Sequence, residues 1–137
     1  MKKVISLILI AMTLFCCAIN SFAAVPEQIV PMWNNISMMT NNLYFDGTEG
    51  DVSATVVGKL GTTQIVGSLI VYKQVSSGWK LVGQESATSS TQTLNINFPF
   101  DAVSGGYYKS VFTVTVTING VNESETKTSY KTCPSTN

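Results

Sequence analysis

The residues best suited to chemistry are three carboxylates in the segment 46–51: Asp46, Glu49 and Asp51. Calcium prefers carboxylate oxygens, so this glycine-rich stretch is a candidate calcium site, although its spacing differs from that of an EF-hand loop. A solvated turn between two strands is the alternative. A small carboxylate-based hydrolase is a further alternative, but it needs two carboxyl groups about 5 to 10 Å apart across a cleft, one with a pKa raised by burial. A glycine-rich loop holds such a pair poorly.

Aromatic residues are the next candidates, because an exposed ring can stack on a sugar while neighbouring amides donate hydrogen bonds. Trp33 is followed by Asn34 and Asn35, and it either covers an edge of the fold or contacts a ligand. Tyr107 is expected on the face opposite the core, beside Lys109, where it would add to a binding surface. Trp79 opens an apolar run after a Ser-Ser-Gly turn, and we expect it to pack in the core.

Cys133 is the third candidate, because an odd cysteine in a secreted chain indicates an intermolecular disulfide or a free thiol. It lies near the end of the given sequence, on a tail that we expect to be too short for deep burial. A covalent dimer through Cys133 is therefore one hypothesis, and an inert thiol is the other. A catalytic role fails because no histidine is present to activate the sulfur.

The composition excludes several classes of function. The 137 residues contain no His and no Arg, and the 8 Lys balance the 8 acidic residues. Without His, the serine triad, Cys/His catalysis and ordinary zinc sites are excluded. A formal net charge of zero gives no attraction for nucleic acid. We therefore expect no enzyme, no catalytic residue and no cofactor apart from the possible calcium ion.

The N-terminus has the pattern of a secretory signal peptide. Lys2 and Lys3 precede an apolar run at 4–18, and small residues lead to an expected cleavage site after Ala23. The run is shorter than the roughly 20 residues that span a bilayer, so we expect no membrane anchor after processing. Residues 24–137 would then be extracellular, with Cys133 as their single cysteine.

The positioning elements are expected to be strands. Short apolar runs alternate with Gly, Ser and Asn about every ten residues, which is typical of an all-β chain. Seven strands in a chain of this size favour a single immunoglobulin-like antiparallel β-sandwich. We expect strands at 53–59, 63–73, 79–86, 92–98, 106–118 and 121–131, with a less certain one within 29–45.

This organisation divides the chain into four parts. A signal peptide occupies 1–23, and an N-terminal segment with a possible edge strand occupies 24–45. The sandwich core is expected at 46–131, followed by a C-terminal tail at 132–137. Two strands have unambiguous core faces, carrying Tyr108, Phe112, Val114, Val116 and Ile118 in one and Leu94, Ile96, Phe98 and Phe100 in the other.

The alternation also gives expectations for the turns. At Asn119-Gly120 a two-residue loop would set Glu123, Glu125 and Lys127 opposite core residues, so we expect a three-residue loop over 118–120. At Leu60-Gly61 a two-residue hairpin that pairs Val56 with Ile65 keeps both apolar sets on one face. The segment 101–108 resembles the corner in which a tyrosine hydroxyl bonds to upstream backbone.

Several of these features together resemble a family of short secreted bacterial proteins of unknown function. They are the signal peptide, Pro31-Met32-Trp33, Phe45-Asp46-Gly47, Val71-Tyr72-Lys73 with Gly78-Trp79, Gly106-Tyr107-Tyr108 and the tail 130–134. The resemblance implies secretion and a single domain, and it brings no assigned activity.

The function expected from these observations is a secreted, non-enzymatic binding or interaction module whose partner is a protein or a glycan. It would present loops such as 45–52 and 86–92 to that partner. A self-assembling structural protein of the cell surface is the alternative, in which a sandwich edge or Cys133 joins copies of the chain. The carboxylate-based hydrolase is the third hypothesis.

Overall fold

The structure, a computed structural model, describes residues 32–135, and every regular element in that range is a β-strand. The expected signal peptide lies outside the described residues. The all-β prediction is confirmed. The strands are β1 (Ile36–Asp46), β2 (Glu49–Gly58), β3 (Thr62–Val75), β4 (Gly78–Ser89), β5 (Thr93–Asp101), β6 (Tyr107–Ile118) and β7 (Val121–Thr132).

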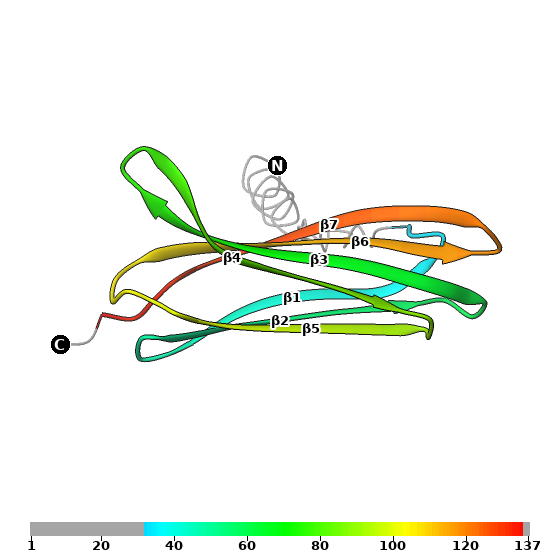
Figure 1. Ribbon diagram of the computed structural model, residues 1–137, viewed down its shortest axis with the longest axis horizontal. Helices are drawn as coiled ribbons and strands as arrows, with labels where there is room; N and C mark the ends of the chain where they lie inside the picture. Colours follow the sequence, from blue (N-terminus) through cyan, green and yellow to red (C-terminus); the bar gives the residue numbers. More distant parts are fainter. Residues whose placement is uncertain (1–31, 136–137) are drawn as a thin grey trace, which may run out of the picture. The chain divides into compact units, whose positions relative to one another are not determined.

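The strands form two antiparallel sheets packed face to face (Figure 1). The three-stranded sheet has the order β1-β2-β5, and the four-stranded sheet has the order β4-β3-β6-β7. In a constant-type immunoglobulin domain the fourth strand joins the first, second and fifth. Here β4 pairs with β3 instead, and Figure 1 shows the end of the β3–β4 hairpin twisting away from the rest of the sandwich.

The sandwich begins earlier than the sequence indicated. The possible edge strand is β1, and its Ile36, Met39 and Leu43 are buried in the core. The expected boundary at residue 46 therefore separates β1 from the core to which it belongs.

Both predicted core faces are observed. Tyr108, Phe112, Val114 and Val116 of β6 are buried with Leu94 and Ile96 of β5. Ile118, Phe98 and Phe100 are half-buried. The backbone N–H of Val103 donates to the Tyr108 hydroxyl at 2.8 Å, as the corner predicted.

The expected hairpin at Leu60-Gly61 is wrong, because β2 and β3 lie in different sheets. Val56 and Ile65 are both buried, but they belong to facing layers and not to paired strands. Two strands whose apolar side chains share one core show the same alternation whether they pair within one sheet or face each other from two sheets. The pattern alone could not separate the two arrangements.

The expected three-residue loop before β7 is also wrong. Ile118 pairs with Val121, leaving the two-residue loop Asn119-Gly120 with positive φ values of 50° and 76°. Both angles suit a type I′ turn, for which Asn-Gly is a favoured sequence. This register pairs three charged residues of β7 with buried residues of β6, and they are Glu123, Glu125 and Lys127.

These charges are tolerated because β7 is an edge strand beside β1 of the other sheet. The Glu123 carboxylate accepts hydrogen bonds from the backbone N–H groups of Asn34, Asn35 and Ile36 at 2.8, 2.5 and 3.0 Å. The Lys127 ammonium donates to the carbonyl of Met39 at 2.9 Å. Glu123 and Lys127 of β7 thus connect the four-stranded sheet to β1 and the residues before it.

Candidate ligand-binding surface

A group of aromatic side chains lies on the outer face of the four-stranded sheet. Tyr72 of β3, Lys109 of β6 and Tyr130 of β7 are direct neighbours across the strands. They alternate with buried residues such as Val71 and Tyr108, so they point away from the core. Trp79 of β4 and Tyr107 of β6 complete what we call the aromatic patch: Tyr72, Trp79, Tyr107, Lys109 and Tyr130.

Three rings of the patch contact one another while remaining open to solvent. The centroids of Trp79 and Tyr107 are 5.9 Å apart, and each lies 6.1 Å from that of Tyr130. The two tyrosine rings are nearly parallel, with 16° between their planes. The exposed fractions are 37% for Trp79, 37% for Tyr107 and 55% for Tyr130. Rings clustered in this way present one continuous apolar surface with polar edges.

Lys109 is the cation of the patch. Its Nζ lies 4.4 Å from the centre of the Trp79 ring and 4.9 Å from that of Tyr72. These are cation–π distances, at which the negative face of each ring attracts the ammonium group. The rings therefore hold the lysine head within the patch.

The outer face of this sheet carries no carboxylate among the described residues. Glu85, Glu123 and Glu125 are opposite the buried Leu69, Val116 and Val114, so all three point to the other side of the sheet. Hydroxyl groups dominate the rest of the face. Thr113, Thr115 and Thr117 of β6 each exchange a hydrogen bond with a β7 side chain, at 2.7 to 3.0 Å. This threonine row faces outward, as the sequence indicated.

The outward position of Trp79 contradicts the expected core packing. Trp79, Leu81 and Ala87 are separated by even numbers of residues, so uninterrupted alternation would place all three on one face of β4. The side chain of Ala87 packs against the core. A register shift intervenes, because Val71 pairs with Gly83 whereas Tyr72 pairs with Leu81. This bulge leaves Val82 as the extra residue and turns the start of β4 over. Simple alternation could not locate it, although Gly83 within the apolar run was a possible signal.

The structure keeps the two predicted ligand-contact residues apart. Tyr107 lies on the outer face beside Lys109, as expected. Trp33 is half-buried and packs against the core, and its carbonyl accepts a hydrogen bond from Lys59. The next residues lie at the opposite end of β7 from the patch, where Asn35 donates to the carbonyl of Val121 at 2.9 Å. Trp33 therefore covers the sandwich outside the patch.

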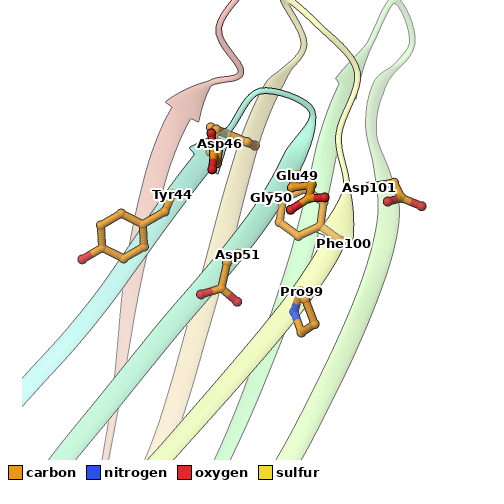
Figure 2. A pocket seen from close by; sticks show the side chains of 9 residues that line it. Tyr44, Asp46, Glu49, Gly50, Asp51, Pro99, Phe100 and Asp101 are labelled. Carbon is orange, nitrogen blue, oxygen red and sulfur yellow. The ribbon is translucent and has the colours of Figure 1, made fainter.

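The predicted acidic cluster surrounds an open pocket of about 540 Å³ at the β1–β2 hairpin (Figure 2). Glu49 is opposite Asp46 on one side and Asp101 on the other, and Asp51 lies one step further along β2. Asp101 was missed because it is distant in sequence. Figure 2 shows the carboxyl groups of Asp51 and Asp101 well apart, with Phe100 and Pro99 between them.

This arrangement gives no support to the calcium hypothesis. Between residues 32 and 135 no group of three or more His, Cys, Asp or Glu side chains is placed to hold a metal ion. The expected loop 45–52 is mostly strand, since β1 ends at Asp46 and β2 begins at Glu49, which leaves a turn at 47–48.

The expectation that Cys133 lies on a tail too short for burial is wrong. The side chain is 0% exposed, and its thiol donates to the carbonyl of Gly47 at 3.2 Å. The backbone of Cys133 exchanges hydrogen bonds with Gly105 and Gly106, at 3.1 and 2.8 Å, which fixes the tail against the β5–β6 connection. An intermolecular disulfide would require this tail to detach, so this conformation disfavours the covalent dimer.

The described part of the chain has no helix that is long and apolar enough to cross a membrane.

Comparisons with known proteins add little beyond the fold. Neither models of protein families nor curated proteins give a match, so the resemblance to a secreted bacterial family stays a prediction. Among solved structures, CsgH from R. palustris is similar at 13% identity and a TM-score of 0.43, over 65% of this chain and 88% of CsgH. Spo0M, a sporulation control protein from Bacillus subtilis, is similar at 15% identity and a TM-score of 0.38, over 70% of this chain and 49% of Spo0M. At these identities the likeness concerns the all-β fold alone.

Proposed function

We propose that this protein is a secreted, non-enzymatic binding module that holds a glycan on the outer face of its four-stranded sheet. The observation that carries the proposal is the contact among three exposed rings, Trp79, Tyr107 and Tyr130. Soluble proteins rarely expose large contiguous apolar patches, and those they expose tend to mark interaction sites.

The groups around the rings favour a sugar as the ligand. Gln74 is opposite Trp79 and Thr132 is opposite Tyr107, so amide and hydroxyl groups border the stacking surface. A sugar ring presents an apolar face and several hydroxyl groups, and it would use both features. An open sheet face also admits a polymer that continues beyond the site.

The proposal of a non-enzymatic role rests on the setting of the carboxylates. A glycosidase acid–base pair needs a carboxyl group shielded from water. Asp46, Glu49 and Asp101 are all exposed at the edge of an open pocket, and Asp51 is only half-buried there.

Removing a patch ring is expected to weaken glycan binding at least tenfold. Trp79→Ala and Tyr130→Ala each delete a stacking surface, and a loss of about 1.4 kcal/mol corresponds to tenfold in affinity. Affinity electrophoresis in gels containing soluble polysaccharides measures the effect directly. Tyr44→Ala is the matched control, because Tyr44 is 50% exposed but lies on the other sheet. Equal retardation of Tyr44→Ala and Tyr130→Ala, or no retardation of the unmodified protein by any polysaccharide, would remove the proposal.

Self-assembly is the second candidate, and the distribution of charge favours it. Asp46, Glu49, Asp51 and Asp101 lie at one end of the three-stranded sheet, whereas the aromatic patch with Lys109 lies on the other sheet. A contact between these unlike faces of two copies is heterologous, and it would join further copies into a ring or an open chain. Sedimentation analysis tests it, since a mass that rises with protein concentration and falls with salt would support assembly, and a constant monomer mass would exclude it.

A further inference from the structure

Lys109 indicates the chemical class of the ligand. We propose that the glycan is an anionic polysaccharide, in which a carboxylate pairs with Lys109 while the sugar ring stacks on Trp79 and its neighbouring tyrosines. This inference rests on the proposed function, because it concerns the same site.

The first argument is that Lys109 lacks a partner of opposite charge. Its ammonium group contacts the rings of Tyr72 and Trp79, and within residues 32–135 it has neither a hydrogen-bond acceptor nor a carboxylate. Two other lysines are engaged by the fold: Lys59 donates to the carbonyl of Trp33, and Lys127 donates to that of Met39. The donors of Lys109 are left for a group outside the described chain.

The second argument is that the lysine is pre-positioned. A free lysine side chain loses rotamer entropy when it binds a ligand. Lys109 is half-buried between strands, with Tyr72 and Tyr130 directly opposite it on either side. The rings already restrict the head group, so less ordering remains when an anion arrives, and an ammonium–carboxylate hydrogen bond is stronger than a neutral one.

The third argument is the placement of the acidic residues. No carboxylate among the described residues shares the outer face with Lys109, whereas Asp46, Glu49 and Asp101 gather on the other sheet. An approaching polyanion is repelled from the acidic end of the three-stranded sheet. Among the described residues Lys109 is the one cation on the outer face, so the attraction for a polyanion acts on the face that has the stacking rings.

The ligands for the test are polygalacturonate and the same polymer after reduction of its carboxylates to hydroxymethyl groups. Affinity is measured for the unmodified protein and for Lys109→Met, Lys109→Arg and Lys80→Met. Lys80 is the matched control, because it is opposite Lys73 on the β3–β4 hairpin and does not belong to the patch. Thermal unfolding of each variant establishes that it is folded.

We expect Lys109→Met to weaken binding of polygalacturonate about tenfold or more and to weaken binding of the reduced polymer much less, so that the variant loses most of the preference for the charged polymer. Lys109→Arg should retain most of the affinity, and Lys80→Met should resemble the unmodified protein. Binding of polygalacturonate should also weaken as salt increases.

Three results would overturn the inference. Equal affinity for the two polymers would show that the carboxylate is not read, while the proposed glycan function would survive. Equal losses of affinity for polygalacturonate in Lys109→Met and Lys80→Met would show that the effect comes from the net charge of the protein and not from the position of Lys109. Self-association that disappears in Lys109→Met would indicate that Lys109 binds the acidic face of a second copy of the chain and not a glycan. Failure of the proposed function itself is distinguishable, because neither polymer would bind and Trp79→Ala would change nothing.

Discussion

Replacing Glu123 by alanine is expected to lower the free energy of unfolding by about 2 to 4 kcal/mol, because the variant loses charged hydrogen bonds worth roughly 1.5 to 3 kcal/mol each, discounted for partial exposure. The carboxylate accepts the backbone N–H groups of Asn34, Asn35 and Ile36, at the start of β1. β1 and β7 belong to different sheets, so no ladder of backbone hydrogen bonds joins them. Glu123 supplies that connection at one end of the sandwich.

The same contacts make this part of the stability depend on pH. Partial burial raises the pKa of Glu123, but the three backbone donors and the nearby Lys59 outweigh it, so the pKa lies below its ordinary value of 4.5. A carboxylate with a lowered pKa binds fewer protons in the folded state than in the unfolded state. Its contribution is therefore complete above about pH 4.5 and is lost as the pH falls through the lower folded value.

Urea unfolding at pH 7 and at several values between pH 5 and pH 3 measures both effects. The difference in stability between the unmodified protein and Glu123→Gln should shrink as the pH falls. Glu125→Gln is the matched control, because Glu125 is also half-buried on the same face of β7 but accepts no hydrogen bond from the described residues. A constant difference across this pH range, or an equal loss in Glu125→Gln, would contradict the assignment.

Glu123 also explains why the last turn was predicted incorrectly. The sequence contains a strong signal for a two-residue hairpin, Asn119-Gly120, and a conflicting signal from the charges opposite Val116, Val114 and Phe112. The conflict disappears once β1 lies beside β7. Which strands meet at the edge of a sandwich is a long-range property, and no local pattern in β6 or β7 reports it.

The aromatic patch was predictable in part. Tyr107 and Lys109 were placed outward by the alternation of β6, which has no interruption. Trp79 was misplaced because the bulge at Val82 reverses the faces of β4 within a few residues. The contact of Trp79 with Tyr130 joins strands that are not neighbours in sequence, so only the folded sheet brings these rings together.

Cys133 was misjudged for a related reason. A short tail was expected to lack the partners for burial, but the β1–β2 turn and the β5–β6 connection meet around it. The thiol reaches Gly47, and the backbone reaches Gly105 and Gly106. Both turns lie far from Cys133 along the chain, so its burial depends on the assembled end of the sandwich.

Replacing Asn41 by leucine is expected to lower the free energy of unfolding by about 3 kcal/mol, of which the two amide N–H hydrogen bonds account for about 1 kcal/mol each and the unpaired Ser110 hydroxyl for about 1 kcal/mol. Asn41 is buried in β1, and its amide nitrogen donates to the carbonyls of Ser110 and Lys127 at 3.0 and 2.8 Å. The hydroxyl of Ser110 returns a hydrogen bond to the amide oxygen at 2.9 Å. The network joins β1 to β6 and β7 of the other sheet inside the core. It lies further along β1 than the contacts of Glu123.

A double-mutant cycle separates the cost of the unpaired hydroxyl from that of the lost packing. In Asn41→Leu the Ser110 hydroxyl is left buried without its acceptor, whereas Asn41→Leu/Ser110→Ala removes both partners. The double variant should therefore recover about 1 to 2 kcal/mol relative to the sum of the single losses, as measured by urea unfolding. Asn42→Leu is the control at the next, exposed position of β1 and should change stability by about 0.5 kcal/mol or less. Strictly additive losses would mean that the Ser110 hydroxyl and the Asn41 amide oxygen do not stabilise each other, and the polar connection through Asn41 would then rest on its two hydrogen bonds to the backbone carbonyls of Ser110 and Lys127.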